Sequence, residues 1–557
     1  MRSVAFLLAA ISLLADAAAD TCGKRYTPAQ LRTAPVDEIL GVPLAAEAAY
    51  RVATIDVVRQ DIFNSDDPAE SKALFRLANL WHINTREDVI RTLLLFEEGD
   101  AVTAARIDES ERLLRRKRFL YDGRVIANRQ CDGDIDVAVV TRDVWSLLLT
   151  AGVTRTGGKQ EFEIGASEIN LLGTGADLDF EVFENLDRDG LSLGFADTNV
   201  RNSRVGVRFR YEDTDDGQSL LARVGQPFYA YDARRSWDLR AQESTRNRRL
   251  YRRGQEIATF AVDYKLAQAS VGWSKGLVDG YANRFNVGFT IEEQRLDPIS
   301  GIEGLRDRAF AYPWVSFERI EDEYAKTRNL DRVQTTEDVF LGKQFTALLG
   351  YSPRGDGFLV GSTSWRDGWR FPKDEPSAGE REGLAPRMNV LLYGLQASGY
   401  WNAHTKRAEN VVGSAWARYR HRHTPRLALH LDAQATVTDQ LDPDQQILAG
   451  GDSGLRGYPN RFQAGSRRFR LTAEERFYTD WYLARVLRVA AAAFVDVGRA
   501  WDSKHDNDVL ANVGVGLRFE STRTDRSLVY HIDLAFPLVD GPGVGGAEIT
   551  LTSKRNL

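Results

Sequence analysis

Arg456 lies in a glycine-rich stretch, 447–460, that reads ILAGGDSGLRGYPN. Apolar and polar residues alternate before it, in 426–438, and after it, in 468–478, so the stretch connects two expected strands. The connection is far longer than a usual hairpin loop of about 2–5 residues. Glycines allow backbone segments to approach closely, and a guanidinium held in place offers several fixed donors to a carboxylate. The stretch is therefore either a mobile surface loop or a binding element.

Two carboxylates on the following strands are candidate partners of Arg456. In 468–478 the apolar residues share one parity, and Glu474 falls on the opposite face. Asp496 alternates in the same way with the valines on either side of it. If the loop folds inward, Arg456 forms charge-assisted and partly bidentate hydrogen bonds with Glu474 and Asp496. The alternative is that these carboxylates only balance the arginines on their own face: Arg468, Arg470 and Arg476.

Motifs of enzymes and metal sites are missing from the sequence. It contains no G-x-S-x-G, H-E-x-x-H or G-x-x-x-x-G-K-[ST] motif. His421 and His423 have no cysteines or carboxylates at the spacing of a metal site. We therefore expect a protein that is not an enzyme and that needs no cofactor. A hydrolase assembled from distant strands is the weakest alternative.

Composition and charge limit the class of protein further. The chain has 557 residues, enough for more than one domain, and its net charge of -6 argues against nucleic acid as a partner. Beyond the N-terminus no apolar run reaches the roughly 18 residues that a membrane-spanning helix needs. This does not exclude a membrane barrel, whose strands need only about 9–11 residues each and face lipid at alternate positions.

The first residues, 1–19, predict a secretory signal peptide. Arg2 provides the positive charge, 4–14 the apolar core and 17–19 a small-residue cleavage site before Asp20. The alternative is a short buried helix. In an exported chain, the two cysteines, Cys22 and Cys131, are either a single disulfide that pins an N-terminal extension or two free thiols.

The region after the signal peptide predicts an extension followed by a small α+β domain, 50–142. The extension, 20–49, is rich in alanine and proline and has the composition of a linker. In the domain, hydrophobic periodicity and capping residues predict strands at 50–63, 122–130 and 134–141 and helices at 84–95 and 108–116.

From residue 143 to 557 the sequence indicates an all-β antiparallel structure. About 20 alternating segments follow one another, and a twisted sheet of that size must close or split. Arginines and carboxylates crowd the polar faces, which favours a transmembrane barrel with a wet lumen over a soluble sandwich. Aromatic residues at segment ends fit an interfacial girdle: Phe228, Tyr229, Tyr231, Tyr400, Trp401, Trp481 and Tyr482.

Several motifs in this order resemble the BamA/TamA-type outer-membrane assembly superfamily, also called the bacterial surface antigen family. The stretch Gly454, Leu455, Arg456, Gly457 and Tyr458 is similar to its loop motif. Further resemblances are the N-L-L-G-x-G turn at 170–175, the E-x-R-F element at 474–477, the F-x-D-x-G motif at 494–498 and a POTRA-like segment at 85–143.

The resemblance implies a periplasmic POTRA domain feeding a barrel of about 16 strands in the bacterial outer membrane. It implies that loop 440–466 enters the lumen, with Arg456 bound to Asp496 and Glu474. The expected partners are outer-membrane lipid, client β-barrel or secreted polypeptides and periplasmic accessory proteins. Clients would add a strand to a POTRA edge, and the seam between the first and last barrel strands, the latter expected at 547–552, would open. A passive pore or structural barrel without insertase activity is the alternative.

Overall fold

A computed structural model describes residues 22–301, 303–354, 357–371, 389–503, 507–525 and 528–555. The expected signal peptide at 1–19 lies outside these residues. The chain divides into two compact units, Met1–Trp145 and Ser146–Leu557. The expected boundary after residue 142 lies close to this division. None of the described helices is long and apolar enough to cross a bilayer.

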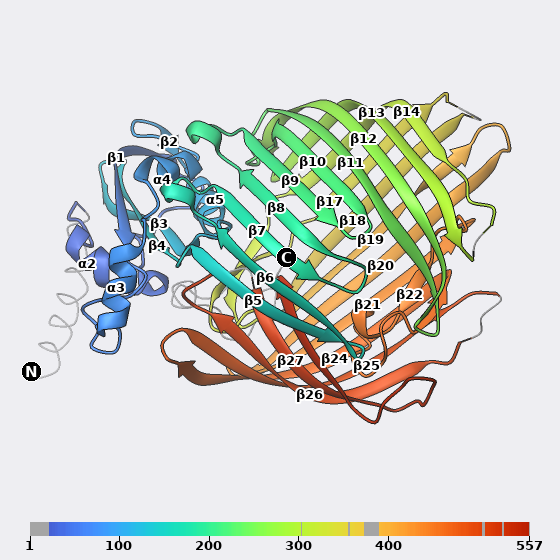
Figure 1. Cartoon of the computed structure of the whole chain (residues 1–557). Coiled ribbons are helices and arrows are strands. Elements are labelled where there is room, and N and C mark those ends of the chain that lie inside the picture. The colour runs from blue at the N-terminus through green and yellow to red at the C-terminus, as the bar shows by residue number, and fades with distance from the viewer. Residues whose placement is uncertain are drawn as a thin grey trace, which may run out of the picture. The chain divides into compact units, whose positions relative to one another are not determined.

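The first unit is built on a four-stranded sheet in the order β2-β1-β4-β3 (Figure 1). Its strands are β1 Tyr50–Gln60, β2 Ala101–Val102, β3 Leu120–Cys131 and β4 Asp134–Asp143. Its helices after the extension are α3 Ala73–Trp81, α4 Glu87–Leu93 and α5 Ala104–Arg115. α3 and the two-residue strand β2 were not predicted, and the other elements match their expected places within a few residues. α5 forms because Ile107 and Leu114 recur on one side and are buried, as an amphipathic helix requires.

The N-terminal extension is not the linker that its composition suggests. It contains α2 (Pro28–Thr33) and the turn η1 (Val36–Glu38), and its apolar side chains are buried in a cluster with residues of β1, β3 and β4. Its backbone also bonds the outer edge of β3, where Val42 N donates to Ala127 O at 2.7 Å. Cys22 and Cys131 form a disulfide with their Cα atoms 4.7 Å apart. The extension therefore covers the edge of β3 and is fixed there covalently.

Replacing Cys22 and Cys131 by serine should loosen this extension. A disulfide that closes a loop of about a hundred residues contributes on the order of 2–5 kcal/mol to the free energy of unfolding. We expect trypsin to cleave the segment 22–49 of the full-length variant much faster than that of the native protein, with the barrel unchanged in heat-modifiable migration. Equal cleavage rates would show that the hydrogen bonds and apolar contacts hold the extension without the disulfide.

The second unit is a closed antiparallel barrel of 20 strands within the described residues. The segment count is therefore right, and the 16 strands implied by the resemblance are wrong. In chain order the strands are β5 Leu147–Thr156, β6 Lys159–Glu168, β7 Asp177–Glu184, β8 Asp189–Asp197, β9 Gly206–Thr214, β10 Gly217–Gln226, β11 Arg235–Arg252, β12 Gln255–Val278, β13 Tyr281–Ser300, β14 Arg308–Glu321, β17 Gln344–Ser352, β18 Phe358–Phe371, β19 Asn389–Asn402, β20 Arg407–Thr424, β21 Leu427–Asp439, β24 Arg467–Leu483, β25 Leu487–Trp501, β26 Leu510–Ser521, β27 Leu528–Pro537 and β28 Glu548–Arg555. The last strand thus extends beyond the expected 547–552.

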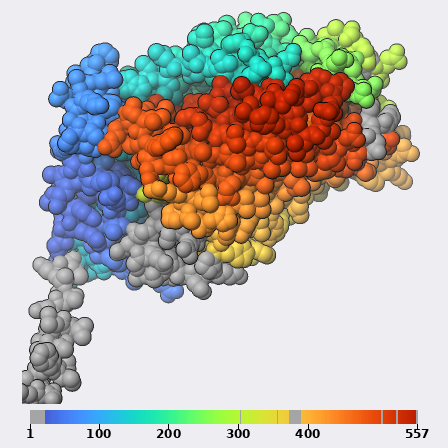
Figure 2. All heavy atoms as spheres, turned by 90° about the horizontal axis from the view of Figure 1, so that it is seen from below, coloured from blue at the N-terminus to red at the C-terminus, as the bar shows by residue number. Residues whose placement is uncertain are grey.

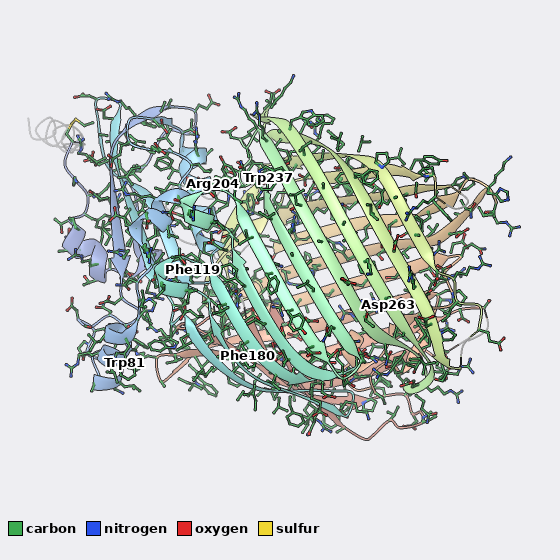
Figure 3. All side chains as sticks on the ribbon, turned by 45° about the horizontal axis from the view of Figure 1, so that its top comes forward. Trp81, Phe119, Phe180, Arg204, Trp237 and Asp263 are labelled. Carbon is green, nitrogen blue, oxygen red and sulfur yellow. A yellow bond between two sulfur atoms is a disulfide. The ribbon has the colours of Figure 1, made fainter. Side chains whose placement is uncertain are left out.

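The outer wall of the barrel is apolar and its inner wall is charged. Leu149 on β5 and Ile164 on β6 are 80% and 70% exposed, and Phe180 of β7 is also exposed (Figure 3). Contiguous exposed apolar surface of this kind is stable in lipid and not in water. At the other parity, Asp496 and Arg518 are almost fully buried. Unit 2 is therefore a transmembrane barrel, of which β24 to β28 form one continuous wall in orange and red in Figure 2.

Two short hairpins lie outside the barrel sheet, one from each end. We call the end at which β5 begins the near end and the end at its turn to β6, residues 157–158, the far end. Loop 440–466 joins β21 to β24 at the far end and holds β22 (Ile447–Ala449) and β23 (Gln463–Gly465). The near-end hairpin, 322–343, joins β14 to β17 and holds β15 (Tyr324–Arg328) and β16 (Thr336–Phe340).

Candidate functional site

Loop 440–466 folds back along the inner wall of the barrel and is packed there. Leu455 and Tyr458 are each 1% exposed, in an apolar cluster with residues of β25 and β26. The Tyr458 hydroxyl donates to Ala511 O at 2.7 Å, so its polar end is also satisfied within the wall. A loop with this much buried surface is a fixed structural element and not a mobile surface loop.

Arg456 is the centre of the contact between loop and wall. Its Nε and one terminal nitrogen donate to the two oxygens of Asp496 at 2.8 and 2.9 Å, a bidentate pair. Its other terminal nitrogen donates to Glu474 at 3.0 Å and to Asp533 at 3.1 Å. The structure thus brings together Arg456, Asp496 and Glu474, the set expected from strand parity.

Asp533 and Arg518 belong to the same network and were not expected there. Arg518 donates to Glu474 at 2.8 Å and also pairs with Asp533, so Asp533 lies between two guanidinium groups, and Glu474 contacts a third one, that of Arg476. Both residues lie on the polar parity of their strands, β27 and β26, which is visible in the sequence. The sequence does not show how deep in the barrel each residue lies, because this depth depends on the register between neighbouring strands.

The neighbouring carboxylates and the ring of Phe494 stabilise Arg456 in this position. Burial alone would lower the pKa of Arg456, but the hydrogen bonds to Asp496 and the charges of Asp496, Glu474 and Asp533 raise it above its ordinary value. The guanidinium carbon lies 3.2 Å from the ring centroid of Phe494, which adds a cation–π contact. Arg456 is therefore permanently charged.

The other residues of the loop motif shape the backbone around this arginine. Gly454 has a φ of +95°, a left-handed conformation that favours glycine. A Cβ on Gly457 would lie 2.8 Å from the Cβ of Asn512, so glycine there lets the loop approach β26 closely. With Leu455 and Tyr458 buried, the motif positions Arg456 by packing on both sides of it.

The loop also binds the first strands of the barrel. Asn460 donates through its amide to Thr156 O, at the end of β5, at 2.8 Å. Arg461 makes a bidentate pair with Asp187, in the turn between β7 and β8, with both distances 2.8 Å. Arginine contacts from the loop therefore connect the last strands of the barrel with the first.

Gly157 gives a direct test of the contact between the loop and the β5–β6 turn. Its φ is +51°, and an added Cβ would lie 2.2 Å from the backbone nitrogen of Asn460. Gly157→Ala should therefore push the loop from this turn and raise proteolytic cleavage within 440–466. Gly158→Ala is the matched control, because its Cβ would find its nearest neighbour at 3.9 Å. Equal cleavage in both variants would contradict this contact.

The described residues contain no group of three or more histidine, cysteine or acidic side chains placed to hold a metal ion. The arrangement in hand binds a loop to a barrel wall. Chemically, it can hold the loop against the barrel wall through buried ion pairs, which are strong but can be broken.

Comparison with known proteins gives structural neighbours only. No protein-family model and no curated protein matches the chain. Similar solved structures include CdiB from Acinetobacter baumannii, at 10% identity over 98% of this chain and 96% of that one, with a TM-score of 0.42. BamA from Haemophilus ducreyi lacking POTRA domains 1–3 has 12% identity over 90% and 84%, with a TM-score of 0.38. The FrpB iron transporter from Neisseria meningitidis has 9% identity over 75% and 84%, with a TM-score of 0.33.

At TM-scores this low, these neighbours decide nothing about activity. The chain's own geometry defines the class: a transmembrane β-barrel whose lumen holds an arginine-anchored loop, preceded by a small α+β unit.

Proposed function

We propose that this chain is an outer-membrane barrel of the assembly and translocation type, which helps client polypeptides to insert into or cross the bacterial outer membrane. The α+β unit acts as a POTRA domain in the periplasm. The predicted signal peptide and the disulfide Cys22–Cys131 support an exported protein, because disulfides persist in oxidising compartments. No enzymatic step or cofactor is part of this proposal.

The closing seam of the barrel is the observation that carries the proposal. Within the described residues, which end at Arg555, β28 pairs with β5 at a single position, Leu551 opposite Arg155. On its other side β28 pairs with β27 without interruption from Leu528 to Ala535. A seam with so little backbone pairing separates at lower cost than any fully paired boundary, and it exposes strand edges to which a client strand can pair.

A free strand edge in the first unit supports client capture. β2 pairs with β1 at Tyr50 and Arg51, and Val52 bonds the backbone of Gly99 and Asp100; beyond Val52, in the described residues, no strand continues along that edge. At Ile55 two side chains stand in for a neighbouring strand: Glu98 accepts from the amide at 3.0 Å, and Arg91 donates to the carbonyl at 2.8 Å. Both side chains are about half exposed, so an extended client can displace them at little cost.

Deletion of the gene tests the proposal. The amounts of other outer-membrane β-barrel proteins and of surface lipids should be compared between the parent strain and the deletion strain. Complementation of the deletion by the native chain is the control. We expect at least one client class to fall. Unchanged amounts of all of them, together with sugar permeation in liposome swelling, would contradict the proposal and identify a passive pore.

A further inference from the structure

The near-end hairpin, 322–343, is the feature that the proposed function does not use. It leaves the barrel between β14 and β17, and its tip, residues 329–335, contacts side chains of β20, β21, β24, β25 and β26. Val333 at the tip is 2% exposed and packs in an apolar cluster with Ala428, Tyr478 and Ala490. A turn that only connected two strands at the end of the barrel would stay exposed. The burial of Val333 therefore indicates that the tip is held inside the barrel.

Glu520 on β26 is the anchor of this tip. Its carboxylate, fully buried, accepts from Val333 N at 2.6 Å and from the Thr335 hydroxyl at 2.8 Å, and Arg332 pairs with it at 2.7 Å. Three donors from four successive residues thus converge on one carboxylate. Charge-assisted hydrogen bonds of this kind are the strong ones.

Asp331 binds the wall at two other strands, β20 and β24. Arg420 on β20 donates to its carboxylate at 3.1 Å, and Arg476 on β24 donates to its backbone oxygen at 3.2 Å. Burial would raise the pKa of Asp331, but the charges of Arg420 and Arg476 hold it below its ordinary value. The tip is therefore attached to two separate parts of the barrel wall.

The hairpin and loop 440–466 are bridged by one ion pair of β24, between Glu474 and Arg476. Arg476, which bonds the hairpin, donates to Glu474 Oε1 at 2.7 Å, and Arg456 of the loop donates to Glu474 Oε2 at 3.0 Å. Two segments that enter from opposite ends of the barrel are therefore linked through the Arg476–Glu474 pair of β24, the hairpin through Arg476 and the loop through Glu474.

We propose that the near-end hairpin is a second plug, so that two plugs in series, joined through Glu474 and Arg476, close the barrel to ions and small solutes. The width of the barrel gives the reason. Barrel diameter grows about linearly with strand number, so 20 strands enclose a lumen that one loop fills less completely than it would a narrower one. The inference concerns closure of the lumen and does not depend on the identity of a client.

Ion conductance of the purified full-length protein in planar bilayers tests this. In a series arrangement both plugs must be displaced for current to flow, so each release multiplies the open fraction. We expect Glu520→Gln to raise the open fraction by about tenfold in an Arg456→Ala background, corresponding to a small shift of a two-state equilibrium. Glu181→Gln in the same background removes an equal charge from the inner face of β7, away from both plugs, and should change nothing. Equal conductance of the Glu520 and Glu181 variants would overturn the proposal.

A disulfide lock decides the question if Glu520→Gln does not fold. Val333→Cys with Ala490→Cys, in the Arg456→Ala background, joins the tip to the wall within its own apolar cluster. Oxidation should suppress the conductance and reductant should restore it, while the parent with Arg456→Ala alone responds to neither. Unaltered conductance in a chain shown by mass spectrometry to be cross-linked would equally overturn the proposal. Client assembly is measured in a separate experiment. The plug proposal can therefore fail while the proposed function holds, and the proposed function can fail while the plug proposal holds.

Discussion

Arg456→Ala should release loop 440–466 from the barrel wall without unfolding the barrel. The substitution removes the guanidinium that faces Asp496, Glu474 and Asp533. Breaking a buried ion pair in this way costs about 3–5 kcal/mol, because Asp496 is left buried without its guanidinium partner, while Glu474 and Asp533 keep Arg518. We expect native heat-modifiable migration, rapid protease cleavage within 440–466 and a clear loss of function.

Arg456→Lys is the matched control for this variant. It keeps the positive charge but loses the planar fork that binds both oxygens of Asp496. We expect an intermediate cleavage rate, since Thr472 and Asn512 still donate to Asp496. If the loop of Arg456→Ala resists protease as well as the native loop does, the packing of Leu455 and Tyr458 holds it alone and the lock is not electrostatic.

Locking the seam should abolish client assembly while leaving the barrel folded. Arg155 and Leu551 are directly opposed across β5 and β28, at a separation suited to a disulfide when both are cysteine. Oxidation of Arg155→Cys with Leu551→Cys should lower outer-membrane protein amounts as far as deletion does, and reductant should restore them. Native cells given the same reductant control for cleavage of Cys22–Cys131.

The chain offers a close control for the seam lock. Leu551 is also opposed to Ile532, on the other side of β28. Ile532→Cys with Leu551→Cys therefore cross-links β27 to β28 and leaves the seam free. We expect this pair to be fully active when oxidised. If client assembly falls equally in both oxidised variants, the cause is a rigid β28 and not a closed seam.

The sequence predicts most of the wall of this barrel, and the reason is periodicity. Alternation along each strand predicts which residues face the lumen, so Glu474 and Asp496 were expected there from parity alone. The same alternation runs through the long strands β11, β12 and β13 and gives a segment count of about 20. The smaller number came from a family pattern, which says nothing about extra strands inserted in one chain.

What the sequence does not predict depends on contacts between distant segments. β15 and β16 have five residues each, too short for a convincing alternation. The acceptor of their tip, Glu520, lies far along the chain, so nothing local marks 322–343 as a plug. Arg518 and Asp533 have the right parity, but only strand register places them beside Arg456. The extension 20–49 has a linker's composition, and its burial depends on the β3 edge that it covers.

That covered edge has a consequence for the life of the protein before it reaches the membrane. An uncovered strand edge is a template on which copies of the same chain can stack into aggregates. Here Arg25 N donates to Asn128 O and Val42 N to Ala127 O, so the extension covers this edge. The Cys22–Cys131 disulfide fixes the extension there. If the chain is exported as proposed, formation of the Cys22–Cys131 disulfide fixes this cover and protects the β3 edge from self-stacking before the barrel is assembled.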